Sequence, residues 1–313
     1  MLEGRVLSAL RAIAGDDAVI ARPNELRVYE CDGYTLEKSA PEVVVLPRST
    51  QQVAEILRLL HRERIAFVPR GAGTGLSGGC LPVDAPVMIG TSRMNRIVEI
   101  DVANRRAVVE AGVVNLSVTN AVAQKGLLYA PDPSSQQACT IGGNVAENSG
   151  GPHTLKYGVT TNHVLGVELV LPNGEVVQLG GAVEDIPGYD LTGLVVGAEG
   201  TFGIVTQAIV RLIRQPEACK TLLGIFESVD DATATVSGII GAGIIPAALE
   251  MMDQLIVEAV QAAFHFGFPT DAGAVLIIEL DGLAAGLDSQ VQRVAEICRA
   301  HQAREVRVAK DAT

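Results

Sequence analysis

The 313-residue sequence has little positive charge, few cysteines and no long apolar run. Its 24 lysines and arginines stand against 36 acidic residues, which leaves a formal net charge of −12. This balance argues against nucleic acid or an anionic membrane as the main partner. An anionic ligand would therefore need a local set of backbone amides or a few well-placed cations.

The five cysteines show neither a C-x-x-C pair nor a paired framework, which leaves room for a free thiol or one bridge. The simpler interpretation is that the protein occurs in a reducing compartment, where its cysteines stay as thiols. The first twenty residues carry charges where a signal peptide needs an apolar core. The most apolar later stretch, VSGIIGAGIIPAALEMM, contains Gly, Pro and Glu250 and is too short to cross a bilayer comfortably. We therefore expect a cytoplasmic protein without a transmembrane segment.

A strand, a helix and a strand follow one another early in the chain. EVVVLP and IAFVP are short β-branched runs, and STQQVAEILRLLHRER lies between them. This middle stretch begins with a capping-box pattern from Ser49 to Gln52. Its apolar residues fall on one helical face: Val53, Ile56, Leu57 and Leu60. The order predicts a small βαβ unit.

Two hairpins and a second domain are predicted further on. The hairpins turn at Ala103-Asn104 and at Asn173-Gly174, and a helix between them ends at Gly126. Pro216 marks a boundary, and 313 residues suit about two domains. Beyond it, strand and helix patterns alternate to the last residues, which indicates a small ferredoxin-like α+β layer.

The stretch PRGAGTGLSGG, residues 69–79, places five glycines directly after an apolar strand. Its GTGLSG matches the letters of the dinucleotide fingerprint, but CLPVDAP follows instead of the helix that the fingerprint requires. A P-loop is excluded because no Gly-Lys-Ser/Thr ends the run. What remains is a turn whose successive amides form an anion-binding nest, or a tight glycine turn without a ligand.

Two further glycine-rich stretches favour the interpretation that the first loop binds a ligand. APDPSSQQACTIGGNVAENSGG, residues 130–151, combines a Pro-Asp-Pro turn with hydroxyl groups, a Gly-Gly pair and two asparagines. GAEGTFGIVT, residues 197–206, runs from a glycine turn into a strand. Such surfaces suit a neutral polar ring or a diphosphate held by amides.

In this order and spacing, the three stretches resemble the FAD-linked oxidases of the vanillyl-alcohol oxidase and p-cresol methylhydroxylase superfamily. The resemblance is strongest to D-2-hydroxyacid dehydrogenases and the FAD-binding subunit of glycolate oxidase. It implies an α+β fold: a p-cresol-methylhydroxylase-type FAD-binding domain at 1–216, made of two α/β subdomains at about 1–100 and 101–216. A partial, ferredoxin-like cap or substrate domain would follow at 217–313.

The resemblance also implies a set of FAD-binding residues. Residues 70–77 would form the pyrophosphate loop, and residues 131–134 would lie along the flavin and its diphosphate. The ribityl and pyrophosphate region would be flanked by Gly142, Gly143, Asn144 and Asn148, with Gly151, Tyr157 and Gly158 close behind. The adenine end or neighbouring backbone would be held by Glu199, Gly200, Ile204 and Val205. Thr74 stands where some relatives attach the flavin covalently to a histidine, so noncovalent FAD is expected. The implied residues are Arg70, Gly71, Ala72, Gly73, Thr74, Gly75, Leu76, Ser77, Pro131, Asp132, Pro133, Ser134, Gly142, Gly143, Asn144, Asn148, Gly151, Tyr157, Gly158, Glu199, Gly200, Ile204 and Val205.

The sequence departs from the family in one respect. Relatives carry metal-binding and proton-abstracting histidines in a His-x-x-Gly-Asp-Gly-Asn-x-x-His-like segment, which this sequence lacks. The resemblance therefore implies a chain truncated at its C-terminus, and no metal site is expected. Among the five histidines, His153 lies beside the flavin motifs and is the candidate for a cofactor or substrate contact.

Two functions remain open. The first is an FAD-dependent dehydrogenase or oxidase that moves a hydride from C2 of a 2-hydroxy acid, glycolate or D-lactate in type, to flavin N5. Its electrons would pass to a separate acceptor or an iron–sulfur partner subunit. The second is a catalytically incomplete FAD-binding module or subunit.

Overall fold

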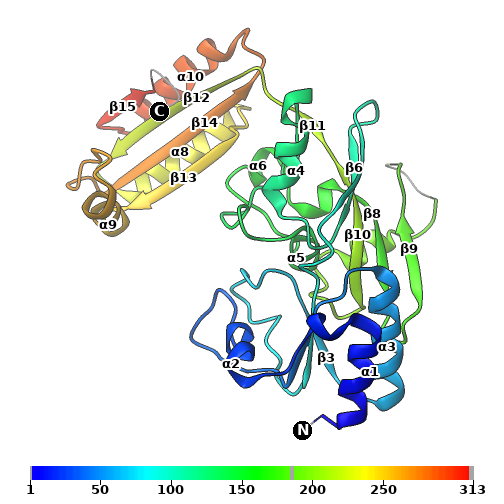
Figure 1. The fold of residues 1–313 in the computed structure, drawn as a ribbon. Helices are drawn as coiled ribbons and strands as arrows, with labels where there is room; N and C mark the ends of the chain where they lie inside the picture. The colour runs from blue at the N-terminus through cyan, green and yellow to red at the C-terminus, as the bar shows by residue number, and fades with distance from the viewer. Residues whose placement is uncertain (1, 184–186, 310–313) are drawn as a thin grey trace. The chain divides into compact units, whose positions relative to one another are not determined.

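The computed structural model describes residues 2–183 and 187–309 (Figure 1). Its contacts divide the chain into two units. The first unit consists of residues 1–151 and 159–214, and the second of residues 152–158 and 215–313. The short segment 152–158 therefore belongs with the C-terminal residues, a division that the local sequence does not indicate.

The first sheet of the first unit has four strands in the order β1-β2-β4-β3. Strands β2 and β3 both run parallel to β4, which lies between them, so α3 connects them as the crossover of the predicted βαβ unit. β1 is antiparallel to β2 at the edge. The elements are α1 Gly4–Ala14, η1 Asp16–Ala18, β1 Val19–Ile20, α2 Pro23–Leu26, η2 Arg27–Tyr29, β2 Val43–Val45, α3 Thr50–Glu63, β3 Phe67–Arg70 and β4 Val87–Gly90.

Helix α3 forms for the reasons that its sequence suggests. The four apolar residues named above are fully buried. The Ser49 hydroxyl accepts the amide of Gln52 at 3.2 Å, which satisfies one free donor of the first turn. The reciprocal half of the capping box does not form, because the Gln52 side chain accepts the amide of Arg48 instead, at 2.7 Å. The helix ends at Arg64 in a left-handed conformation.

The second sheet of the first unit is antiparallel, in the order β5-β6-β10-β8-β9. Both predicted hairpins are present, and Gly174 adopts the positive φ of +80° that its turn requires. The remaining elements are β5 Ile97–Asp101, β6 Arg106–Glu110, α4 Asn115–Val122, η3 Ala123–Lys125, β7 Leu127–Leu128, α5 Ile141–Glu147, η4 Thr160–His163, β8 Val164–Val170, β9 Val176–Gly180, α7 Leu191–Val195, β10 Ile204–Arg211 and β11 Ile213–Arg214.

The second unit confirms the ferredoxin-like prediction. Its antiparallel sheet has the order β13-β14-β12-β15, and a core of alternate strand residues packs with α8 and α10. Helix α9 is an addition between β13 and β14. Its elements are α6 Thr154–Tyr157, β12 Ala218–Phe226, α8 Val229–Gly241, β13 Ala248–Asp253, α9 Gln254–Phe264, β14 Ala274–Gly282, α10 Leu287–Ala300 and β15 Glu305–Val308.

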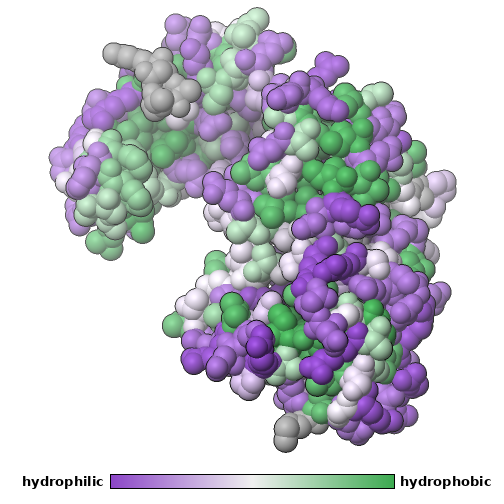
Figure 2. Space-filling model, viewed as in Figure 1, coloured by the Kyte–Doolittle hydropathy of each residue, from purple (hydrophilic) through white to green (hydrophobic). Residues whose placement is uncertain are grey.

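Apolar side chains remain exposed on this addition. Leu255 and Phe264 of α9 are 74% and 65% exposed, and Figure 2 shows apolar colour over this helix. Within the described ranges, no helix has both the length and the apolar character needed to cross a bilayer.

Candidate functional site

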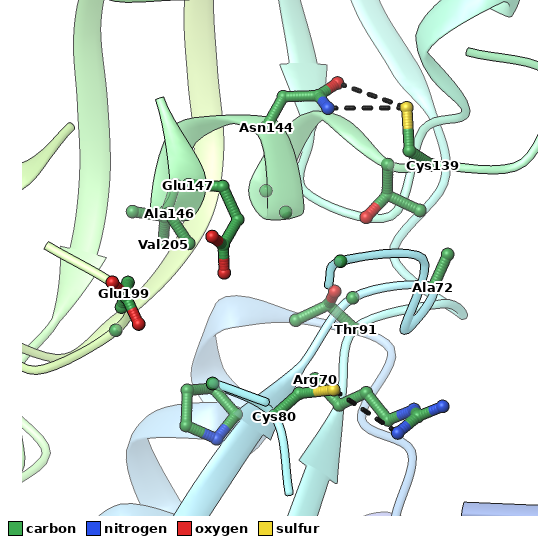
Figure 3. A pocket seen from close by; sticks show the side chains of 18 of the residues that line it. Arg70, Ala72, Cys80, Thr91, Cys139, Asn144, Ala146, Glu147, Glu199 and Val205 are labelled. Atoms are coloured by element: carbon green, nitrogen blue, oxygen red, sulfur yellow. Dashed lines mark hydrogen bonds between the residues drawn. The ribbon is translucent and has the colours of Figure 1, made fainter. Parts of the chain in front are cut away.

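The first unit contains a cavity with about 1150 Å³ of empty space, including open solvent at its mouth. Three segments that are far apart in the sequence line it: the glycine loop after β3, the start of α5, and the turn before β10 (Figure 3). Its lining residues are Asp32, Pro69, Arg70, Gly71, Ala72, Gly73, Thr74, Gly75, Gly79, Cys80, Thr91, Ser135, Cys139, Thr140, Gly142, Gly143, Asn144, Ala146, Glu147, Ser149, Val195, Ala198, Glu199, Gly200, Phe202, Gly203, Ile204 and Val205.

The segment 31–33 holds the glycine loop in place. Three hydrogen bonds join them: the Arg70 guanidinium to the Cys31 carbonyl at 2.9 Å, the Gly78 amide to the Asp32 carboxylate at 2.8 Å, and the Gly33 amide to the Gly75 carbonyl at 2.9 Å. Because these three bonds fix the loop to segment 31–33, the loop backbone can present a constant surface to the cavity.

Arg70 supports the loop through a second set of contacts. Its guanidinium donates to the Cys80 sulfur at 3.3 Å and lies 5.8 Å from the centre of the Tyr29 ring. Arg70 as a whole is 8% exposed. Figure 3 shows it directed toward Cys80. Arg70 therefore acts on the loop's structure, and burial raises the pKa of the Cys80 thiol beside it.

Helix α5 begins at the cavity wall. Gly142 is required there, because a Cβ would lie 2.7 Å from the Cβ of Ala111 and 3.0 Å from its carbonyl oxygen. The Thr140 hydroxyl precedes the helix, is buried, and has no hydrogen-bond partner in the described structure. A buried hydroxyl without a partner costs free energy. A ligand bound in the cavity could supply the hydrogen-bond partner that the Thr140 hydroxyl lacks.

Asn144 is held rigidly on the same helix. It is 2% exposed, its oxygen accepts the Asn115 amide at 3.0 Å, and its amide donates to the Cys139 sulfur at 3.3 Å. Asn115 also donates to the Pro131 carbonyl at 3.0 Å. This network fixes α5 against the 131–139 segment. Cys139, at 4% exposed, packs as a small buried residue.

Two carboxylates face the cavity near the end of the glycine stretch at Gly79. Figure 3 shows Glu147 and Glu199 directed inward. Both approach Gly79, where an added Cβ would lie 3.4 Å from a Glu147 oxygen and 3.1 Å from a Glu199 oxygen. Ser77 donates its hydroxyl to Glu147 at 3.1 Å. Carboxylates accept hydrogen bonds, so this part of the cavity suits a ligand that offers hydroxyl or amino groups.

The structure brings thirteen of the implied FAD residues together at the cavity. They are Arg70, Gly71, Ala72, Gly73, Thr74, Gly75, Gly142, Gly143, Asn144, Glu199, Gly200, Ile204 and Val205. The others do not line it: Leu76, Ser77, Pro131, Asp132, Pro133, Ser134, Asn148, Gly151, Tyr157 and Gly158.

Several residues outside the lining have other visible roles. Leu76 is 72% exposed. Asn148 ends α5 with φ +49° and accepts the Thr161 amide at 2.9 Å. Gly151 packs so closely that a Cβ would lie 2.2 Å from the Asp132 carbonyl oxygen. Tyr157, Gly158 and the candidate His153 belong to the second unit.

Sequence reasoning missed other lining residues. Thr140 and Glu147 lie inside the quoted 130–151 stretch, and their polar character was the available signal. Asp32 and Thr91 come from remote segments and carry no local signal. A metal site is not indicated either, since the residues that the structure describes contain no group of three or more His, Cys, Asp or Glu side chains arranged to hold an ion.

Comparison with known proteins identifies the domains. Residues 41–180 match the family model described as an FAD binding domain, and residues 215–313 match the C-terminal domain of FAD linked oxidases. The chain belongs to the FAD-linked oxidases. This confirms the predicted family, and with it FAD as the cofactor of its binding domain.

Three named relatives are similar to most of the chain. The chain is 45% identical over 306 residues to glycolate oxidase subunit GlcD of Escherichia coli (strain K12), covering 98% of this chain and 61% of the relative. It is 45% identical over 284 residues to GlcD of Bacillus subtilis (strain 168), covering 90% and 60%. It is 35% identical over 268 residues to D-lactate dehydrogenase of Anaerostipes hadrus, covering 83% and 56%. The chain thus spans about three fifths of the curated relatives it matches.

Two solved structures share the fold. Alkyldihydroxyacetonephosphate synthase superimposes with a TM-score of 0.84 at 22% identity, over 100% of this chain and 62% of that one. p-Cresol methylhydroxylase with substrate bound superimposes with a TM-score of 0.79 at 19% identity, over 97% and 65%. The predicted fold class, a p-cresol-methylhydroxylase-type FAD-binding domain followed by a ferredoxin-like domain, is confirmed.

Proposed function

We propose that the cavity of the first unit binds FAD noncovalently and that the chain is an FAD-dependent 2-hydroxyacid dehydrogenase or oxidase. The observation that carries the assignment of FAD to this cavity is the buried, unpartnered hydroxyl of Thr140 at its wall, inside a matched FAD-binding domain. FAD binding is assigned to residues 1–216, and a substrate-covering role to residues 217–313.

The cavity residues fit the parts of FAD. The amides of the 70–77 loop and the Thr74 hydroxyl suit the diphosphate, since an acidic chain must bind an anion through local donors. Glu147 and Glu199 suit sugar hydroxyls or the adenine amino group, because they are acceptors. When bound, FAD supplies hydride acceptance at its N5 atom. The chain's own residues bind the cofactor, orient it and exclude water from the glycine backbone.

The noncovalent mode rests on Thr74, which stands where some relatives carry the flavin-linked histidine. Acid or heat should release the yellow chromophore into the supernatant. Flavin that stayed with the denatured polypeptide would show a covalent link. The noncovalent mode is inferred from this one position alone.

The substrate class rests on the relatives, which are named glycolate oxidase subunit and D-lactate dehydrogenase. We assign this chain a small 2-hydroxy acid of the same type, and a separate electron acceptor or an iron–sulfur partner subunit. The test is anaerobic mixing of the FAD-loaded chain with glycolate and with D-lactate while flavin bleaching is followed. Bleaching by either acid supports the dehydrogenase.

A second candidate function is an FAD-binding module or subunit that lacks the proton-abstracting group. It is favoured by the sequence, which does not contain the His-x-x-Gly-Asp-Gly-Asn-x-x-His-like segment that the family resemblance associates with proton abstraction. Positioned bases contribute about 10²- to 10⁴-fold to rate. FAD binding without bleaching by either acid would support this second candidate.

A further inference from the structure

The segment 152–158, here called the strap, leaves the cavity rim and returns to it. Ser149 lines the cavity, and its carbonyl accepts both the amide of Thr160 at 3.0 Å and the hydroxyl of Thr160 at 2.7 Å. Thr160 is fully buried. The strap is therefore a loop whose two ends are closed at one point of the cavity rim, while its own residues pack with the second unit.

One carboxylate of β14 holds the end of the strap. The Lys156 ammonium bonds both the carboxylate and, at 2.7 Å, the backbone carbonyl of Asp281. The Tyr157 hydroxyl donates to the other carboxylate oxygen of Asp281 at 2.5 Å. The Asp281 side chain is 5% exposed. A carboxylate this buried is stable only when charged or polar donors surround it, so Asp281 and the strap depend on each other.

A second carboxylate holds the start of the strap. His153 Nε2 lies 3.3 Å from Glu279 Oε1, and the same oxygen accepts the Cys219 thiol at 3.2 Å. Residues 279 and 281 alternate with Ile278 and Leu280, which pack in the core with α8 and α10. The two carboxylates therefore share the opposite face of the sheet. The strap is attached there at both ends.

Two groups in these contacts keep the protonation states that their hydrogen bonds require. Burial, followed by the hydrogen bond to Asp281, raises the pKa of the Tyr157 hydroxyl, so it stays a donor in neutral and mildly alkaline solution. The hydrogen bond with His153 lowers the pKa of Glu279, which keeps it an acceptor. The ionisable groups that meet at the strap are His153, Lys156, Tyr157, Cys219, Glu279 and Asp281.

Chain geometry links the strap to the cavity rim. Consecutive Cα atoms are about 3.8 Å apart, so the start of the strap at residue 152 lies within about 11 Å of Ser149. The strap's far end rejoins the rim at Thr160, which is bonded to Ser149. The strap is therefore joined by only a few residues at each end to the part of the chain that includes Ser149, which lines the cavity.

We propose that Asp281 is a positioning residue of the flavin site: by fixing Lys156 and Tyr157 it sets the strap, and the strap sets the rim at Ser149. The attachment of the strap stands on the contacts alone, whereas its effect on flavin rests on the proposed function. Asp281 touches no ligand in this scheme. It acts through the strap.

The test compares Asp281→Asn with wild type in two measurements. Hydrogen exchange of residues 149–160 reports the strap, and fluorescence recovery on FAD release reports the dissociation rate. We expect faster exchange in the strap and FAD dissociation accelerated by about tenfold or more, as is usual when one partner of a buried charge pair is lost. Tyr157→Phe removes only the hydroxyl. It should accelerate both hydrogen exchange and FAD dissociation, but by a smaller factor than Asp281→Asn does.

Asp271→Asn is the matched control. Asp271 belongs to the same unit and accepts two hydrogen bonds from Arg304 at 3.0 Å, but its side chain is 76% exposed. This variant should leave strap exchange and FAD dissociation unchanged. If Asp281→Asn fails to fold, Tyr157→Phe carries the comparison.

The outcomes separate the two proposals. Faster strap exchange with wild-type FAD dissociation would overturn the positioning role and leave only a structural attachment. Unchanged exchange in both variants would overturn the attachment itself. Wild-type chain that binds no FAD would overturn the proposed function and the positioning role together, while the exchange comparison would still decide whether Asp281 holds the strap.

Discussion

The guanidinium of Arg70 lies directly against the backbone of Gly73. An added Cβ at Gly73 would sit 2.1 Å from the Arg70 Nη2 atom, and the residue has a φ of +70°. The first glycine loop is thus packed on its own strand-end arginine, which in turn is bonded to the Cys31 carbonyl. Gly73 is required by this contact before any ligand is considered.

Gly73→Ala should therefore destabilise the first unit as well as weaken FAD binding. The positive φ alone costs about 1–3 kcal/mol, and displacing Arg70 adds to it. Gly75→Ala is the control, because its Cβ would meet nothing closer than a Glu147 oxygen at 3.9 Å. Urea unfolding of the FAD-free variants measures the difference. Equal stability of the two variants would show that the Arg70 contact is unimportant.

Thr140→Val should change stability and affinity in opposite directions. The buried hydroxyl has no partner, so replacing it by a methyl group removes a desolvation cost of about 1–3 kcal/mol and leaves the FAD-free protein as stable as wild type or more so. FAD affinity should fall by about tenfold if the hydroxyl bonds the cofactor. Thermal melting and FAD titration give the two values, and Thr140→Ser should keep wild-type affinity. A Val variant with unchanged affinity would remove Thr140 from the FAD site.

Acid should weaken the second unit through Glu279. Its pKa is lowered from the ordinary value of 4.5 by the hydrogen bond with His153, against the opposing effect of burial. A lowered carboxyl pKa stabilises the folded state above the unfolded pKa, and this contribution is lost as the pH falls through the folded value. Below about pH 4.5, wild type should therefore lose more of its unfolding free energy than Glu279→Gln does.

Urea unfolding across the acid range measures this difference. Glu296→Gln serves as its control, since Glu296 pairs with Arg293 at 3.3 Å with both side chains 62% exposed. That variant should follow wild type at every pH. Parallel pH profiles for wild type and Glu279→Gln would contradict the link.

Cys219 should react slowly for an exposed thiol. Partial burial and then the hydrogen bond to Glu279 raise its pKa to about 12, so the reactive thiolate is scarce at neutral pH. Alkylation by iodoacetamide, followed by peptide mass spectrometry, should be at least about tenfold slower than that of glutathione under the same conditions. Glu279→Gln should accelerate it, because the neighbouring negative charge is gone. A wild-type rate equal to that of glutathione would contradict the raised pKa.

Local patterns in the sequence were sufficient for the elements and for the family. The helix at 50–63 follows from one apolar face and Ser49, and the hairpin at Asn173-Gly174 follows from a dipeptide that accepts positive φ. The alternation after Pro216 was enough for a ferredoxin-like layer. These features depend on residues that are neighbours in the chain, so a single sequence records them.

The composition of the cavity and the path of the strap were decided only by tertiary structure. Asp32 and Thr91 reach the cavity because the first sheet places their segments beside the glycine loop, and neither lies in a recognisable motif. The order in which the strands pair is not evident from the sequence. That order brings residue 281 next to the 152–158 segment, although the two are more than a hundred residues apart in the chain. Gly73 illustrates both levels: its local sequence predicts a glycine turn, while the buried guanidinium against it is a contact that only the folded loop reveals. Long-range packing chooses among many locally equivalent arrangements, and for that reason Asp281 could not be recognised before the fold was known.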